Sequence, residues 1–142
     1  MRVFLDANIL FSAAKTAGAV RELMGLLQKA RHDLVVDDYV VIEARRNLVA
    51  KGPDALSELD LLLARCHHNP VRASAEGIDH AQIGWLPDKD RPVLDAAIHL
   101  RCDALLTGDR THFGASYGKT FGGVMIHSPR SLAEALLSKG NS

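Results

Sequence analysis

The sequence contains little that would mark a specialised class of protein. Its two cysteines, Cys66 and Cys102, stand far apart and form no metal-type pair, so we expect two buried thiols in a reducing compartment. No apolar run reaches the ~18 residues that cross a membrane, and no basic segment followed by an apolar one opens the chain. These absences favour a cytoplasmic protein with no membrane partner.

Neither sign of charge is in excess. Lys and Arg together number 17, and Asp and Glu together also number 17, which gives a net charge of zero. This balance gives no overall support to a nucleic-acid partner, so binding to nucleic acid would depend on a local basic patch. The chain has 142 residues, of which 47% are hydrophobic and 24% charged. It is therefore long and apolar enough to fold around a core of its own.

Short apolar runs alternate with amphipathic segments along the chain. The pattern predicts strands at 3–5, 34–36, 104–106 and 124–126, and helices near 18–30, 41–49, 54–66, 93–100 and from 128 onward. A short extended piece is expected at 70–74, and the segment 75–85 is ambiguous. Alternating strands and helices predict a three-layer α/β/α sandwich with a central, mainly parallel sheet. We expect a single domain over 1–138 and a frayed tail over 139–142.

Four acidic residues occupy positions that a parallel sheet brings together. Asp6 directly follows the first apolar strand and Asp109 comes just after the third, while Glu43 and Asp90 lie near the starts of two helices. In a parallel fold, strand ends and helix starts share one side of the sheet, so we expect the four carboxylates to cluster. Two unit charges ~4 Å apart repel by roughly 4 kcal/mol at an effective dielectric constant of ~20. The cluster must therefore bind a cation or raise its pKa values.

The ligand chemistry of this cluster favours one kind of ion. An all-oxygen set without His or Cys favours Mg²⁺ or Mn²⁺ over zinc, and such a site holds one or two ions. Bound there, the ions would polarise a phosphodiester, activate water and stabilise the leaving oxygen. Asn8 and Thr107 stand beside two of the acids and are expected to orient a carboxylate or a bound water. Asp88 is an alternative or auxiliary ligand to Asp90, whereas Asp95 is expected to be a solvated helix residue.

Each candidate also has an ordinary structural explanation. Asp90 is suited to cap a helix, Asp109 to form a turn, and Glu43 to lie on a solvated helix face. Arg91 and Arg110 each adjoin a candidate ligand, which makes them candidates for contact with RNA phosphates. The other residues that we considered are expected to be surface histidines at a helix end (His67, His68), packing aromatics (Trp85, Phe113) and a less favoured substrate contact (His112).

Two motifs resemble those of the PIN-domain nucleases, including the VapC-type toxins of bacterial toxin–antitoxin modules. They are Val3-Phe-Leu-Asp6-Ala-Asn8-Ile-Leu10 and Leu105-Leu-Thr107-Gly-Asp109-Arg. Between them, Val41-Ile-Glu43 and Asp88-Lys-Asp90-Arg-Pro look like the parts of the family pattern that carry the second and third acids. The resemblance covers nearly the whole chain.

The resemblance implies a ribonuclease that depends on Mg²⁺ or Mn²⁺. By that resemblance Asp6, Glu43, Asp90 and Asp109 would be both catalytic residues and metal ligands, with Asn8 and Thr107 in support. It also implies an RNA substrate and, for a toxin, a cognate antitoxin protein. The apolar helix face at 20–27 suits either the core or a dimer interface, and we expect a homodimer.

Two other functions stay open at this point. The domain could bind RNA or a protein with little cleavage and use the acids as a structural cation site. It could also be a phosphotransferase or phosphatase with Asp6 as the nucleophile. The chain has Asn8 at the position where such enzymes commonly carry a second Asp, which counts against that reaction.

Overall fold

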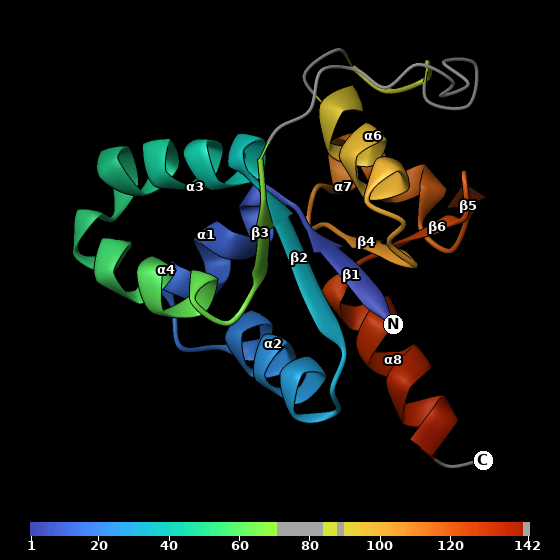
Figure 1. The fold of residues 1–142 in the computed structure, drawn as a ribbon, viewed down its shortest axis with the longest axis horizontal. Helices are drawn as coiled ribbons and strands as arrows, with labels where there is room; N and C mark the ends of the chain where they lie inside the picture. The colour runs from blue at the N-terminus through green and yellow to red at the C-terminus, as the bar shows by residue number, and fades with distance from the viewer. Residues whose placement is uncertain (71–83, 88–89, 141–142) are drawn as a thin grey trace.

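A central six-stranded sheet organises the protein (Figure 1). The computed structural model describes residues 1–70, 84–87 and 90–140. The strand order is β3-β2-β1-β4-β6-β5, and every pairing is parallel except that between β5 and β6. The strands are β1 (Arg2–Leu5), β2 (Asp33–Asp37), β3 (His67–Asn69), β4 (Ala104–Leu106), β5 (Thr120–Phe121) and β6 (Val124–His127). The predicted α/β fold with a mainly parallel sheet is confirmed.

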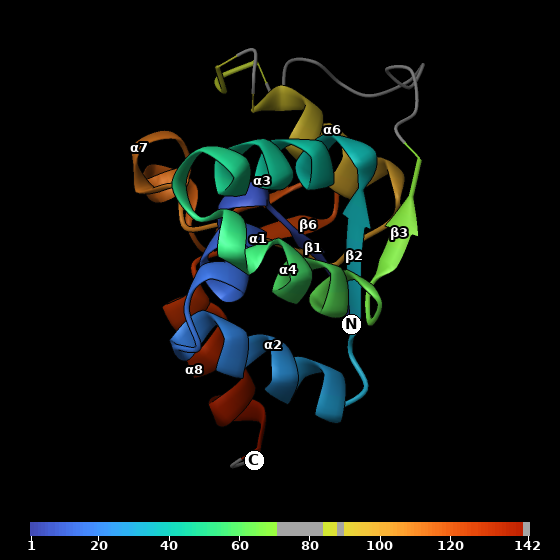
Figure 2. The same ribbon diagram turned by 90° about the vertical axis from the view of Figure 1, so that its left-hand side faces the viewer.

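Helices cover both faces of this sheet. They are α1 (Ala7–Lys15), α2 (Ala19–Lys29), α3 (Asp38–Lys51), α4 (Leu56–Leu63), α6 (Arg91–His99), α7 (Arg110–Phe113) and α8 (Pro129–Gly140). Helices α1 to α4 lie on one side of the strands and α6 on the other, as the two views show (Figures 1 and 2). Helix α8 packs against β6 and α2. Helices α3 and α6 contact each other although they belong to opposite layers.

The central strands form the core because both of their faces are covered. Val3, Phe4 and Leu5 of β1 are 0% exposed, and β4 is buried along its whole length. Strands buried on both faces have continuous apolar sequences, which explains why these two were recognisable without alternation. Each fully buried aliphatic or Phe side chain stabilises the fold by roughly 1.5–3 kcal/mol.

Helix α1 was not expected from the sequence. It starts directly after β1, and the Asp6 carboxylate caps it by accepting a hydrogen bond from the amide of Ala7 at 2.7 Å. Its buried residues include Ile9, Leu10 and Ala13, which have helical spacing but follow the strand without an intervening turn. Asp6 therefore ends a strand and caps a helix at once, so its side chain is fixed at the sheet edge.

Two short strands were also missed. The histidines at 67 and 68 were expected at a helix end, but they lie in β3, an edge strand that pairs with β2. Both are exposed surface residues, as predicted, and each is paired with an aspartate. Strand β5 has only two residues and pairs antiparallel with β6. Neither strand has the apolar pattern that sequence analysis relies on, because edge strands are held mainly by backbone pairing.

Several smaller expectations can be compared with the structure. Asp37 caps α3 by accepting a hydrogen bond from the amide of Val40 at 3.1 Å. Cys102 is buried and Cys66 half-buried, and burial raises the pKa of both thiols to about 11. None of the helices in the described ranges is long and apolar enough to cross a membrane. Except for Pro70, the expected extended piece over 70–74 lies outside the described residues, as does most of the ambiguous segment 75–85.

Candidate active site

Asp6 lies at the centre of the candidate site, at the carboxyl end of β1. Its side chain accepts hydrogen bonds from the hydroxyl of Thr107 at 2.8 Å and from Asn8 Nδ2 at 3.3 Å. Only 5% of the residue is exposed. Burial, with a smaller contribution from the nearby charges of Glu43 and Asp90, raises the pKa of Asp6 to about 6, against the hydrogen bonds from Thr107 and Ala7 that lower it. The carboxylate is thus desolvated and repelled by two others, an arrangement that a cation would relieve.

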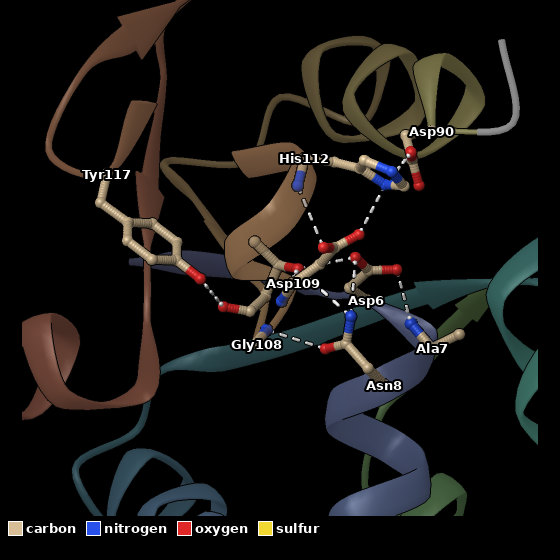
Figure 3. Close-up of polar contacts among 9 residues, drawn as sticks. Asp6, Ala7, Asn8, Asp90, Gly108, Asp109, His112 and Tyr117 are labelled. Atoms are coloured by element: carbon tan, nitrogen blue, oxygen red, sulfur yellow. Dashed lines mark hydrogen bonds and ion pairs between the residues drawn. The ribbon is translucent and has the colours of Figure 1, made fainter. Parts of the chain in front are cut away.

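A network of hydrogen bonds joins the ends of β1 and β4 around Asp6 (Figure 3). Asn8 Oδ1 accepts a hydrogen bond from the amide of Gly108 at 2.8 Å, and Asn8 Nδ2 lies 3.3 Å from Thr107 Oγ1. The Thr107 hydroxyl also accepts from the amide of Asp109 at 3.2 Å. β1 and β4 are adjacent, and the chain connections leave them in opposite directions, which is where open α/β sheets form their binding sites.

Asp90 and Asp109 meet at the ring of His112 (Figure 3). Nδ1 of His112 lies 2.7 Å from Asp90 Oδ2 and 2.8 Å from Asp109 Oδ2. The other oxygen of Asp109 caps α7 by accepting from the amide of His112 at 3.1 Å. Asp90 occupies the N-cap position of α6, but its side chain makes no capping hydrogen bond. The prediction that Asp90 caps a helix is therefore wrong, because its carboxylate faces the site.

Helix α3 brings the fourth acid to the same region. Glu43 is half-buried and close enough to Asp6 to raise the pKa of that carboxyl. Tyr39, one helical turn earlier on α3, has a hydroxyl whose pKa is raised by burial and then by Glu43, Asp90 and Asp6. Tyr39 thus lines the acidic region, and its spacing from Glu43 was a signal that sequence reasoning did not use.

The donor atoms gathered here fit a divalent cation. Asp90, Asp109 and His112 each offer one ligand atom, and these atoms all lie within 4.8 Å of one another. The charges of Asp6 and Glu43 add to the negative potential at this edge. Carboxylate oxygens with an imidazole nitrogen can hold Mn²⁺ or a similar ion, and carboxylates alone can hold Mg²⁺. Sequence reasoning did not foresee the histidine as part of this donor set.

The two arginines predicted to contact RNA, Arg91 and Arg110, differ in their surroundings. Arg91 donates to the carbonyl oxygens of Leu86 at 2.9 Å and Gly84 at 3.0 Å, so it anchors the turn before α6. Arg110 is exposed, and its charge reaches Tyr117, whose hydroxyl donates to the Thr107 carbonyl at 3.1 Å.

The remaining candidates are either packed or beyond the described residues. Trp85 packs edge-on against buried Phe113 with ring centroids 6.2 Å apart, which confirms the packing prediction. Asp95, expected to be solvated, is only half-exposed, and its Oδ1 is enclosed. Asp88 lies outside the described residues.

Comparison with known proteins identifies the family. The family model described as "PIN domain" matches residues 2–111. The chain belongs to the PIN domain family. A search of curated proteins finds no match for this PIN domain.

Solved structures share the fold of this PIN domain. A chain of the VapBC2 structure from Rickettsia felis, bound to a promoter DNA fragment, matches with a TM-score of 0.67 and 18% identity, covering 90% of this chain and 98% of that one. FitAcB from Neisseria gonorrhoeae matches with a TM-score of 0.59 and 17% identity, covering 90% and 98%. VapC20 from Mycobacterium tuberculosis, described as a Sarcin-Ricin loop cleaving toxin, matches with a TM-score of 0.58 and 11% identity, covering 83% and 98%. At these identities the likeness concerns the fold.

Proposed function

We propose that this PIN domain is a metal-dependent endoribonuclease that acts as the toxin of a VapC-like type II toxin–antitoxin module. The observation that carries the proposal is the gathering of acids at the carboxyl edge of β1 and β4. Buried Asp6 is repelled by Glu43 and Asp90, while Asp90 and Asp109 meet at one nitrogen. Family membership supports the nuclease class, and the resemblance of the motifs supports the assignment of the individual acids.

Asp6, Glu43, Asp90 and Asp109 would hold Mg²⁺ or Mn²⁺ and thereby serve catalysis. A bound divalent ion supplies positive charge that polarises a phosphodiester and lowers the pKa of water. The protein's part is to hold the carboxylates in place: Thr107 and Asn8 fix Asp6.

The flanking residues would support the substrate and the ion. Exposed Arg110 is well placed to contact an RNA phosphate, whereas Arg91 could do so only in addition to holding its turn. Asp88 is kept as an auxiliary ligand.

The proposed partners follow from the toxin role. The Rickettsia felis structure is named for a VapBC pair, so we propose that this chain also has a cognate antitoxin protein. Ile42 and Val49 on α3 are 54% and 63% exposed and seven residues apart, which puts them on one face of the helix. That face could pack against an antitoxin or a second copy, and we keep the homodimer as part of the proposal. We also propose that the activity is cytoplasmic, since that is where a toxin of this kind would meet its RNA substrate.

Cleavage of defined RNAs by the purified protein tests the proposal. We expect Mn²⁺-dependent endonucleolytic cleavage by the unaltered chain and a loss of at least about 100-fold in Asp6→Asn, since the ligand charge is removed from the site. Asp54→Asn is the matched control, because Asp54 is an exposed acid in the 3₁₀ turn Pro53–Ala55. Cleavage that survives the combined Asp6→Asn and Asp109→Asn changes would refute the catalytic role. A protein that binds RNA without cutting it would instead support the binding function.

A further inference from the structure

His112 occupies an unusual position between two carboxylates. A single ring nitrogen, Nδ1, lies 2.7 Å from an oxygen of Asp90 and 2.8 Å from an oxygen of Asp109. An imidazole nitrogen carries at most one proton, so it cannot give a full hydrogen bond to both oxygens at once. The three atoms converge from the N-cap position of α6, the turn after β4, and α7 (Figure 3).

The position of the ring is set by the backbone. The amide of His112 donates to Asp109 Oδ1 at 3.1 Å, which closes the first turn of α7 and fixes the start of the imidazole side chain. Nδ1 then reaches the second oxygen of the same carboxylate. Because the backbone amide of His112 is also bound to Asp109, we expect the ring to stay beside this carboxylate when a metal ion binds between the two.

We propose that His112 Nδ1 is a direct nitrogen ligand of the divalent ion held by Asp90 and Asp109, and that this nitrogen makes the site prefer Mn²⁺ to Mg²⁺. The inference rests on the metal site of the proposed function. Neighbouring ligands around an ion at about 2.1 Å are about 3 Å apart when they lie at right angles. The nitrogen-to-oxygen separations of 2.7 and 2.8 Å are close to that spacing, so small movements would open a coordination site.

The preference follows from ligand chemistry. Mg²⁺ takes oxygen ligands and keeps several waters, whereas imidazole suits transition metals. A site made of carboxylates alone would discriminate less between Mg²⁺ and Mn²⁺. The nitrogen would bind through its lone pair, with the ring proton on Nε2.

Electron spin-echo spectroscopy of the Mn²⁺-loaded protein tests directly whether a histidine nitrogen binds the ion. A nitrogen bound to Mn²⁺ modulates the echo through its ¹⁴N nucleus, and we expect this modulation in the unaltered chain. Incorporating ¹⁵N-histidine into the same chain should change the modulation to that of ¹⁵N, without altering any side chain. His112→Ala should abolish it, while His67→Ala should keep it. His67 is the matched control because it too pairs with an aspartate, Asp33, at 3.3 Å.

Affinity measurements provide a second readout. We expect His112→Ala to weaken Mn²⁺ binding by on the order of tenfold or more and Mg²⁺ binding by less, so that the preference falls. If Mn²⁺ binds and Asp109→Asn weakens it, but no histidine nitrogen couples to it, the inference is wrong and the proposed function stands. Modulation that persists in folded His112→Ala also overturns it. Failure of the unaltered chain to bind Mn²⁺ at all would overturn both the inference and the metal site.

Discussion

Replacing Asp6 by Asn should stabilise the metal-free protein at neutral pH. Burial raises the pKa of Asp6 from 3.8 to about 6, so the folded state holds this proton more tightly than the unfolded state does. The stabilisation that the fold gains from holding this proton is therefore fully present below pH 4 and is lost as the pH rises through 6. The shift of about two pKa units corresponds to about 3 kcal/mol. At pH 7.5 the unaltered chain carries this cost, and the uncharged Asn avoids it.

Part of that gain will be offset by hydrogen bonding. Asp6 accepts hydrogen bonds from the Thr107 hydroxyl and from Asn8 Nδ2. If the amide NH₂ of Asn takes the place of the accepting oxygen, it cannot accept these bonds, because it is itself a donor. The loss of one such bond costs about 1 kcal/mol. We therefore expect Asp6→Asn to raise the free energy of unfolding by about 1–2 kcal/mol at pH 7.5.

Urea unfolding in the presence of a chelator measures this effect. The advantage of Asp6→Asn over the unaltered chain should shrink as the pH falls from 7.5 to 4, because the carboxyl then becomes protonated in the fold. Asp54→Asn should show no such trend, since its side chain is exposed. A variant that is less stable than the unaltered chain at pH 7.5, with unchanged pH dependence, would refute the account of a desolvated, repelled carboxylate.

Three further predictions concern the support of the site and of the fold. Asn8→Ala removes the side chain that joins the ends of β1 and β4, and it should slow RNA cleavage 10–100-fold while costing about 1 kcal/mol in urea unfolding. Glu43→Gln should weaken Mn²⁺ binding about tenfold in calorimetry, because one charge of the cluster is lost. Gly122→Ala should destabilise the fold by about 1–3 kcal/mol, because Gly122 has φ +55° and an added Cβ would lie 2.9 Å from Ile98 Cδ1.

Matched controls separate these effects from general disturbance. Glu22→Gln changes an exposed acid of α2 and should leave Mn²⁺ affinity unchanged. Gly25→Ala adds a Cβ with nothing within 4 Å and should stabilise α2 slightly. Equal Mn²⁺ affinity in Glu43→Gln and the unaltered chain would remove Glu43 from the cation site. A neutral Gly122→Ala would show that the backbone there relaxes freely.

Much of the sheet edge could be predicted because parallel strands end on the same side. The buried runs before Asp6 and Thr107 identified β1 and β4, and adjacency of the two strands brought Asp6, Asn8 and Thr107 together as expected. Helix α1 was missed because its apolar spacing starts with no turn after β1. Strand β3 was missed because its sequence, His67–Asn69, has no apolar residue.

The contacts of His112 could not be predicted for a different reason. Its contact with Asp109 is local, through the short helix α7, but its contact with Asp90 joins segments far apart in the sequence. Periodicity reports which face of a helix is apolar, and it does not say which distant carboxylate a polar ring will reach. The spacing of Tyr39 from Glu43 does put both on one face of α3, but the proximity of Tyr39 to Asp6 and Asp90 depends on how α3 packs against α6.

The dependence of RNA cleavage on free Mn²⁺ tests the central claim most directly. With single-turnover kinetics and Mn²⁺ binding measured on the same preparation, we expect no cleavage in chelator and a rate that rises with the occupancy of the site. Asp109→Asn should shift both curves to higher Mn²⁺ together. Cleavage that persists in chelator, or a rate curve unrelated to the binding curve, would contradict a shared carboxylate site as the seat of catalysis.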